Sequence, residues 1–288
     1  MIDPIFLAEA ALNGILLGGV LALLALGLNL IFGVIDIVWI AYVDLVMICM
    51  YAVYFIVQVG GYPIWLGGLA SIALGAVLGI GVHLLIISPI LTSAPVNQLL
   101  ATGGLLFFLQ SFATFLWTTD HRTVRLTLPR LELFDMPISV ARLIAFGLAI
   151  LVMLGLYVFL TRTYIGTAIR AVSQDREAMA LMGANPKTVY LVTSAVGGAM
   201  AGVAAALLII QYAVHPYFGG AFGPLTFMIC VLGGLGNMVG AFVASFIMSE
   251  VIAISGVVWS TEMGYVIAFV IFIVLIFARP GGIFARRS

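Results

Sequence analysis

The sequence predicts an all-α protein, a polytopic bundle of about 8–10 transmembrane helices that includes one short segment broken by glycines. Of its 288 residues, 64% are hydrophobic and only 8% are Asp, Glu, Lys or Arg, whereas about a quarter of a soluble domain is charged. Residues 45–119, 75 positions in a row, contain none of these four residue types, which is enough for about three bilayer crossings. The composition excludes a soluble enzyme, a nucleic-acid-binding protein and a disulfide-built secreted domain.

Hydrophobic segments bounded by Pro, Gly or charged residues give the expected spans in chain order. They lie at residues 10–32, 36–57, 63–87, 96–117, 141–160, 189–212, 223–234, 238–256 and 262–278. No basic residue precedes the first segment, so we expect a retained span rather than a cleaved signal peptide. Together these spans form a single transmembrane domain over residues 1–288.

The seventh and eighth spans come from one long hydrophobic stretch, residues 222–258. As a single helix it would be about 55 Å long at 1.5 Å per residue, whereas the hydrocarbon core is only about 30 Å thick. The glycine-rich residues 233–237 are the natural break. Short, glycine-interrupted segments of this kind are where transporters place non-helical backbone beside a pathway.

Basic residues set the expected orientation. Four lie in the connection of residues 161–188 and three lie beyond residue 278, so we expect both segments on the cytoplasmic side. In the connection of residues 118–142, four arginines are accompanied by three acidic residues. One span separates the connection of residues 118–142 from that of residues 161–188, so residues 118–142 are expected outside. Nine crossings then put the N-terminus outside and the C-terminus in the cytoplasm.

Glycines are spaced for close helix packing. Pairs four residues apart occur within spans at Gly14 and Gly18, Gly75 and Gly79, Gly198 and Gly202, and Gly236 and Gly240. Such pairs allow two helix backbones to approach each other in a bilayer. We expect them to pack helices within the chain rather than to form a dimer motif.

The sequence patterns of intramembrane enzymes and ATP-binding proteins are absent. No serine stands two residues after a glycine, and there is no H-E-x-x-H. His83, His121 and His215 belong to different segments, so we expect interfacial side chains rather than metal ligands. The only lysine, Lys187, follows Pro186, where a phosphate-binding loop requires glycine. We expect no catalytic residue, metal site or cofactor on this chain, and its zero net charge gives no reason to expect nucleic acid as a partner.

The connection of residues 161–188 is expected to contain a short amphipathic helix. Its hydrophobic residues recur at helical spacing, at Ile165, Ile169, Val172, Met179 and Met182. Gly183 offers a helix stop, and Asn185-Pro186 enforces a turn. Such a helix either lies on the lipid surface, which composition alone slightly favours, or docks into a partner protein.

Residues 170–185 resemble the coupling loop of bacterial ABC importer permeases of the branched-chain amino acid (Liv) type. Four further segments are similar to this family in the same order, residues 13–33, 100–110, 231–240 and 277–284. The resemblance covers essentially the whole chain. Its most specific parts are the coupling loop and the ending Arg-Pro-x-Gly-x-Phe.

The resemblance implies several subunits in the bacterial cytoplasmic (inner) membrane. Two permease subunits form the pore, two cytoplasmic ATPase subunits hold ATP and Mg²⁺, and an external binding protein delivers the solute. A heterodimeric pore is favoured over a homodimer. The positions that match the coupling loop, which contacts the ATPases, are Arg170, Asp175, Glu177, Ala178, Leu181 and Gly183.

The chain departs from the family's pattern in the second span. The family usually has Asn-Phe-Ala-His-Gly-Glu there, whereas this chain has Trp39-Ile40-Ala41-Tyr42-Val43-Asp44. Trp39 in place of Asn and Val43 in place of Gly are expected to stiffen and narrow whatever this segment lines. The solute can therefore differ from the family's usual small amino acids and amides.

Five residues are candidates for lining the translocation pathway. Asp44 is expected either to line it or to hydrogen-bond a neighbouring helix, because a carboxylate inside a bilayer is costly. Thr102 and Gln110 lie eight residues apart on nearly one face of the fourth span and either face the pore or bond across a helix interface. Trp39 and Tyr42 are three residues apart and could form an aromatic wall. For these four residues, structural packing is the default interpretation.

The predicted function is that of a transmembrane permease subunit, not an enzyme, in an ATP-driven importer of branched-chain amino acids or similar small polar solutes. The alternative is a self-sufficient ion-coupled carrier or channel. A carrier has little use for a rigid helix flanked by basic residues, and one firmly intramembrane carboxylate offers little for ion coupling. The importer is therefore preferred.

Overall fold

The computed structural model of the chain describes residues 4–124, 130–133, 136–182, 185–279 and 281–283. Within these residues the fold is a helical bundle with one two-stranded antiparallel hairpin, in which Arg130 pairs with Ser139 and Leu133 with Met136. The predicted all-α membrane bundle is confirmed.

The helices follow one another along the whole chain. In order they are α1 (Pro4–Ile35), α2 (Tyr42–Tyr54) with its π-helical continuation η1 (Phe55–Val59), α3 (Ile64–Val82) continued by η2 (His83–Ile87) and α4 (Ser88–Ile90), α5 (Pro95–Trp117), β1 (Arg130–Leu133), β2 (Met136–Ser139), α6 (Val140–Arg162), α7 (Tyr164–Gln174), α8 (Arg176–Leu181), α9 (Pro186–Leu208), α10 (Phe218–Gly233), α11 (Met238–Val258) and α12 (Thr261–Ala278). Seven described helical segments are long and hydrophobic enough to cross a membrane, and α10 and α12 are shorter hydrophobic helices. Each predicted span coincides with one of them.

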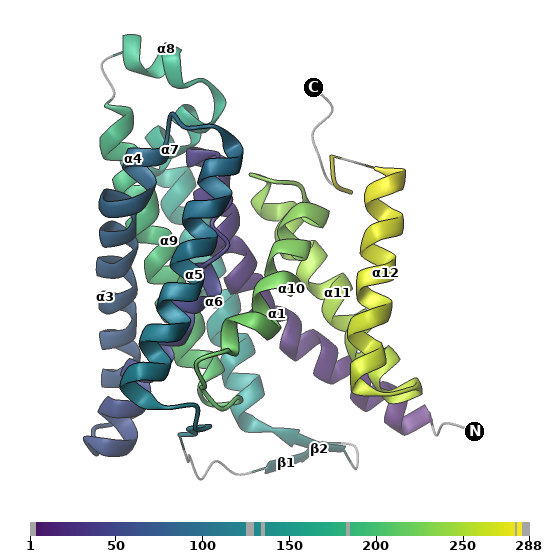
Figure 1. Ribbon diagram of the computed structural model, residues 1–288. Helices are drawn as coiled ribbons and strands as arrows, with labels where there is room; N and C mark the ends of the chain where they lie inside the picture. Colours follow the sequence, from purple (N-terminus) through teal and green to yellow (C-terminus); the bar gives the residue numbers. More distant parts are fainter. Residues whose placement is uncertain (1–3, 125–129, 134–135, 183–184, 280, 284–288) are drawn as a thin grey trace.

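The connections gather at two opposite ends of the bundle (Figure 1). Helices α4, α7 and α8 and the last turn of α12 lie at one end, which we call the α8 end. The start of α1 and the β1–β2 hairpin lie at the other, the hairpin end. The two connections predicted to face opposite sides of a membrane, residues 118–142 and 161–188, are therefore at opposite ends.

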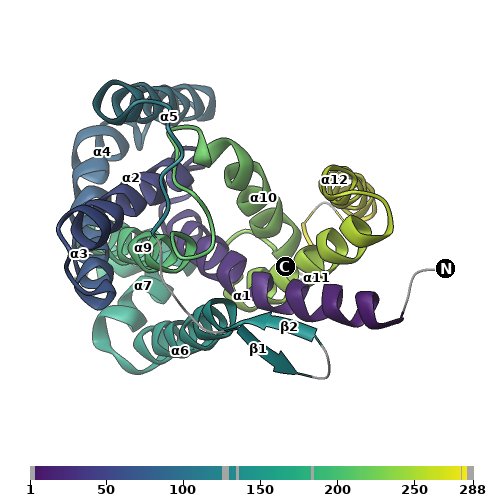
Figure 2. The same ribbon diagram turned by 90° about the horizontal axis from the view of Figure 1, so that it is seen from below.

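Helix α1 is the central element (Figure 2). Every residue of α1 from Val20 to Ile31 is buried, and all of them except Gly27 and Asn29 are hydrophobic. It packs against α6, α9, α10 and α11. A helix that is hydrophobic all round must be covered on every side, and α1 meets this condition inside the protein rather than against lipid.

Glycine pairs make a tight helix crossing between α3 and α9. A side chain at Gly75 or Gly79 would overlap backbone atoms of Ser194 and Gly198. Ser71 also donates a hydrogen bond to the carbonyl of Gly202 across the crossing, at 2.7 Å. The prediction that these glycines pack helices within the chain is confirmed.

One predicted boundary is wrong, because residues 36–41 do not begin a helix. Helix α1 ends at Ile35, and Asp36 has a φ of 63°, a left-handed conformation that Asp tolerates and that ends a helix. The following segment enters the bundle without helical hydrogen bonding and brings Trp39 to a fully buried position. Helix α2 starts only at Tyr42.

Candidate functional site

The connection between α10 and α11 is a tight turn, as the glycines at residues 233–237 predict. Gly234 and Gly236 have φ values of 91° and 81°, which residues with a Cβ rarely adopt. Asn29 of α1 holds the turn, because its side-chain amide donates to the carbonyl of Asn237 at 2.9 Å and its Oδ1 accepts the N–H of Gly236 at 2.7 Å. The break in the membrane segment is thus anchored to the central helix.

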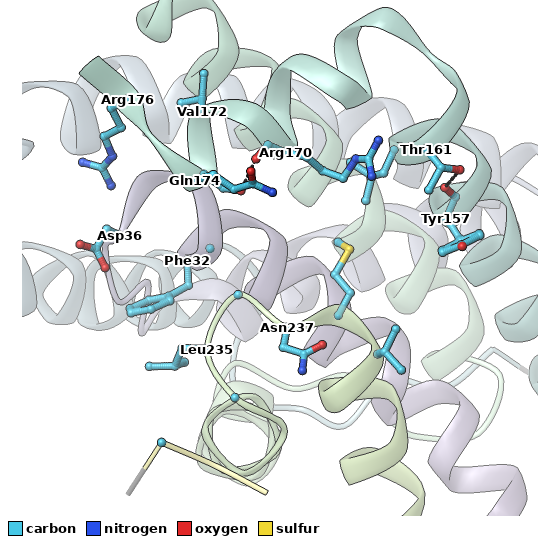
Figure 3. A pocket seen from close by; sticks show the side chains of 18 residues that line it. Phe32, Asp36, Tyr157, Thr161, Arg170, Val172, Gln174, Arg176, Leu235 and Asn237 are labelled. Carbon is cyan, nitrogen blue, oxygen red and sulfur yellow. Dashed lines mark hydrogen bonds between the residues drawn. The ribbon is translucent and has the colours of Figure 1, made fainter. Parts of the chain in front are cut away.

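A groove of about 870 Å³ lies beside this turn, at the α8 end. Its walls come from the end of α1, α6, α7 and the α10–α11 turn (Figure 3). Arg170, Gln174 and Arg176 line it from one side and Asp36 and Asn237 from the other. The groove is therefore polar and shares its wall with the predicted coupling segment.

A second cavity, of about 380 Å³, lies between α5 and α10 and is closed by residues 38–43. Its lining is almost entirely hydrophobic and glycine-rich. The lining residues are Leu28, Val38, Trp39, Ile40, Tyr42, Val43, Leu99, Leu106, Gln110, Gly219, Gly220, Gly223, Pro224 and Phe227. Asp36 lines the groove while Val38 and Trp39 line the cavity, so the non-helical segment stands between the two spaces.

Asp44 lies directly behind the wall of this cavity. The side chain is only 1% exposed, and Gln110 of α5 donates a hydrogen bond from Nε2 to its Oδ1 at 2.9 Å. A Cβ at Gly219 of α10 would lie within 3 Å of the carboxylate carbon and of both its oxygens. Asp44 therefore ties α2 to α5, and the glycine at position 219 gives the carboxylate room against α10.

The other three predicted pathway residues contact neighbouring segments of the bundle. The hydroxyl of Tyr42 donates to the carbonyl of Gly197 at 3.0 Å, and Thr102 donates to the carbonyl of Val38 at 3.0 Å. The rings of Trp39 and Tyr42 meet edge to face, with centroids 6.0 Å apart. Both rings line the cavity, whereas Thr102 does not.

Trp39 differs from its neighbours in one respect. Its indole Nε1 is buried and has no hydrogen-bond partner among the described residues. A buried donor without a partner costs roughly 1–3 kcal/mol. Trp39 thus carries one buried donor that no other described residue satisfies.

The predicted coupling segment consists of two helices rather than one. Helix α7 ends at Gln174, and Asp175 caps the start of α8 by accepting the N–H groups of Glu177 and Ala178 at 3.0 and 2.9 Å. A side-chain acceptor that binds these backbone donors competes with a continuous helix, which is why the amphipathic pattern breaks here. The prediction of one uninterrupted helix is wrong at this residue.

Helix α8 stands out from the bundle at its free end (Figure 1). Leu181 is 90% exposed and Met182 84% exposed, although both are hydrophobic. Its other end is fixed, because the Arg176 guanidinium donates to the carbonyl of Val34 at 3.5 Å and stacks over the ring of Tyr190. Gly183, the sixth predicted coupling position, lies outside the described residues.

Sequence reasoning missed a cluster at the hairpin end. His121 and His215, which it treated as scattered, lie side by side with tilted rings whose centroids are 4.5 Å apart. Arg122 and Val214 pair through two backbone hydrogen bonds of 2.9 and 2.8 Å, which bring the two loops together. Burial, and then the neighbouring His121, lower the pKa of His215. Nothing in the local sequence marks this pair, because a long-range backbone pairing creates it.

No group of three or more His, Cys, Asp or Glu side chains that could hold a metal occurs in the described part of the chain. The candidate site therefore consists of the predicted coupling segment, the polar groove, the hydrophobic cavity and the buried Asp44–Gln110 pair. Its arrangement is suited to conducting a solute and to mechanical coupling.

Comparison with known proteins places this arrangement in a family. A family model described as the branched-chain amino acid transport system permease component matches residues 10–276. The chain belongs to this family. It is thus a permease component of a branched-chain amino acid ABC transport system, a multi-pass membrane protein without catalytic activity of its own. The match decides against the self-sufficient carrier or channel.

Individual permeases of the family are similar to this chain over nearly its full length. The branched-chain amino acid permease protein LivH of Salmonella typhimurium is 29% identical over 98% of this chain and 96% of its own length. LivH of Escherichia coli K12 gives the same values, and BraD of Pseudomonas aeruginosa is 28% identical over 96% and 95%. No solved structure matches the chain. A permease of such a system works with ATPase subunits and a binding protein.

Proposed function

We propose that this permease forms one half of a heterodimeric pore in the bacterial inner membrane. Two cytoplasmic ATPase subunits would bind at α8, and an external binding protein would deliver a branched-chain amino acid or a similar small polar solute. ATP and Mg²⁺ would be held by the ATPases. The observation that carries the proposal is the end of α8, where Leu181 and Met182 are almost fully exposed on a short capped helix.

Hydrophobic side chains at a projecting helix end are more stable when buried in a groove of a partner protein than when exposed to water. An interface commonly depends on a few such anchors. Asp175 fixes where α8 starts, and Arg176 joins it to the end of α1. Movement of α8 by an ATPase would therefore reach residues 36–41, which stand between the groove and the cavity.

The orientation follows from charge. The α8 end carries the basic residues of the connection 161–188 and Arg279, and basic connections face the cytoplasm. The hairpin end, with the start of α1, would then face the outside. In this orientation the solute enters near the hairpin end, passes the cavity between α5 and α10, and leaves through the polar groove.

The pathway residues have graded roles in this proposal. Trp39, Tyr42 and Gln110 line the cavity, and Asp44 lies behind Gln110. Thr102 acts indirectly, because its hydroxyl holds the backbone at Val38. The second permease would close the cavity and the groove from the side that this chain leaves open.

The test is to replace Leu181 by Asp and purify the tagged complex in a mild detergent. Removing a hydrophobic anchor of this kind is expected to reduce ATPase recovery at least about tenfold, and ATP-driven uptake in proteoliposomes should fall with it. Tyr62→Asp is the matched control. Tyr62 is also a large exposed side chain, but it lies in the turn before α3, at the hairpin end. Unchanged ATPase recovery with Leu181→Asp would contradict the proposal.

A further inference from the structure

Asp44 has an unusual setting for a carboxylate. It lies within a predicted membrane span and is 1% exposed, and it makes no salt bridge with any described residue. Its side-chain partner is the neutral amide of Gln110. Intramembrane carboxylates are expensive and usually pair with a cation or line a solute or ion path. A carboxylate that faces only an amide is poised to accept a cationic partner.

The cavity between α5 and α10 adjoins this carboxylate. Two of its lining residues, Gln110 and Gly219, are also the residues that contact Asp44. Figure 2 shows α2 beside α5 and α10. A modest movement of the Gln110 side chain would therefore expose Asp44 to whatever occupies the cavity.

The remaining walls of the cavity define what else its occupant must carry. Val43, Leu106 and Phe227 are hydrophobic and suit an aliphatic group. Trp39 belongs to the same wall, and its indole Nε1 is buried without a hydrogen-bond partner among the described residues. The cavity thus combines a hydrophobic lining with a nearby carboxylate.

We propose that Asp44 binds the ammonium group of the transported solute while the aliphatic part of that solute occupies the cavity. Gln110 holds the carboxylate when the cavity is empty and gives it up to the ammonium group, which is the stronger donor because it is charged. This assignment rests on the proposed transport function and makes Asp44 a specificity-determining residue. It predicts discrimination between solutes that differ only in the charged amino group.

The structural alternative is that Asp44 merely ties α2 to α5 through Gln110. The two roles differ in their dependence on charge. Asn at position 44 retains the shape and can still hydrogen-bond Gln110, so a tie between helices survives this change, whereas ammonium binding does not. Asp44→Asn therefore separates the two roles without removing a buried polar group.

The experiment uses the assembled transporter in nanodiscs, without the external binding protein. Two radiolabelled probes are compared, L-leucine and L-2-hydroxy-4-methylpentanoate, in which a hydroxyl replaces the ammonium group. Asp44→Asn is expected to weaken leucine binding at least about tenfold and hydroxy-acid binding less than about twofold. Glu250→Gln is the matched control, because it removes a membrane carboxylate on α11 that packs at Gly14, away from the cavity. It should change neither affinity.

Gly219→Ala is a second variant in case Asp44→Asn lowers the yield of the complex. Its methyl group would displace the Asp44 carboxylate, so the selective loss of leucine binding should recur. Equal losses for both probes, or unchanged leucine binding in Asp44→Asn, would overturn the inference. These outcomes are distinct from failure of the transport function, which would appear as absence of ATP-driven leucine uptake by the wild-type complex.

Discussion

Two helix contacts in this permease follow opposite rules. Between α3 and α9, glycines bring the backbones together, so that Gly75 lies against Gly198 without room for a methyl group, and the buried His83 and Ser194 side chains are hydrogen-bonded at 3.0 Å. Between α5 and α10, the glycines at positions 220 and 223 face open space, and a cavity of about 380 Å³ remains. The same residue type thus closes one contact and leaves the other open.

We infer that the difference separates a rigid scaffold contact from the proposed pathway. In a bilayer, close packing is the main force that holds helices together, so the α3–α9 contact is suited to stay fixed. A contact with unfilled space forgoes this packing and can change shape at little cost. Substitutions in the two contacts should therefore affect different properties, folding in the first and transport in the second.

The largest effect is expected from Gly75→Ala in the closed contact. The added methyl group would overlap the backbone of Gly198, which cannot move without separating α3 from α9. Overpacking against backbone should cost about 3 kcal/mol, seen as a lower midpoint in thermal unfolding and a smaller monodisperse fraction. Gly81→Ala on the same helix is the control, because nothing lies within 4 Å of its added methyl group. Equal behaviour of the two variants would refute the scaffold role.

A smaller loss of stability is expected from Asn29→Ala, which tests whether the end of α10 is anchored to α1. Asn29 makes three hydrogen bonds to the α10–α11 turn and is fully buried. Leaving these backbone groups unpaired should lower the free energy of unfolding by about 2–4 kcal/mol. Asn97→Ala, at an exposed position of α5, should change it by less than about 0.5 kcal/mol. Unfolding monitored with a thiol-reactive dye provides both values.

Filling the open contact should affect transport and spare stability. Gly223→Leu places a large side chain in the cavity, where nothing lies within 4 Å of the new Cβ. ATP-driven uptake should fall about tenfold, which corresponds to about 1.4 kcal/mol, while the unfolding midpoint stays within about 2 °C of the wild type. Gly104→Leu, which has equal space but lies outside the cavity lining, should transport normally. A comparable drop with Gly104→Leu would remove the distinction between the two contacts.

The smallest effect on stability concerns two loops at the hairpin end, one that follows α5 and one that precedes α10. The pKa of His215 is held below its ordinary 6.5 by burial and by His121. As pH falls below 6.5 the unfolded chain binds this proton before the folded one, so stability is present above that pH and declines below it. Unfolding midpoints at pH 7.5 and pH 5.5 should differ more in the wild type than in His215→Gln. Identical pH responses would show that the pair does not contribute.

The approximate limits of the membrane-spanning helices follow from the sequence, because they depend on local properties. Hydrophobic length decides where a helix can span a bilayer, and the glycine-rich residues 233–237 interrupt the hydrophobic stretch of residues 222–258. The prediction failed at Asp36 and Asp175, where an acidic residue adopts a left-handed or capping conformation. Such conformations are only marginally favoured locally, and the surrounding packing selects them.

The candidate site was predictable in part. Asp44 and Gln110 were identifiable as polar residues in hydrophobic segments, but their hydrogen bond joins residues 66 positions apart. Trp39 was identifiable as a departure from the family's pattern, whereas its unpartnered Nε1 depends on what surrounds it. The contact between His121 and His215 had no sequence signal at all.

The sequence by itself determined that this protein is a membrane-spanning helical permease, and it predicted a coupling segment at residues 161–188. Composition, hydrophobic length and the predicted coupling pattern are local properties of the sequence and do not depend on contacts between helices. Only the tertiary structure decided which glycines close a contact and which leave it open, and which side chains face Asp44. These properties depend on distances between helices that are remote in the chain, and the packing of the whole bundle sets those distances.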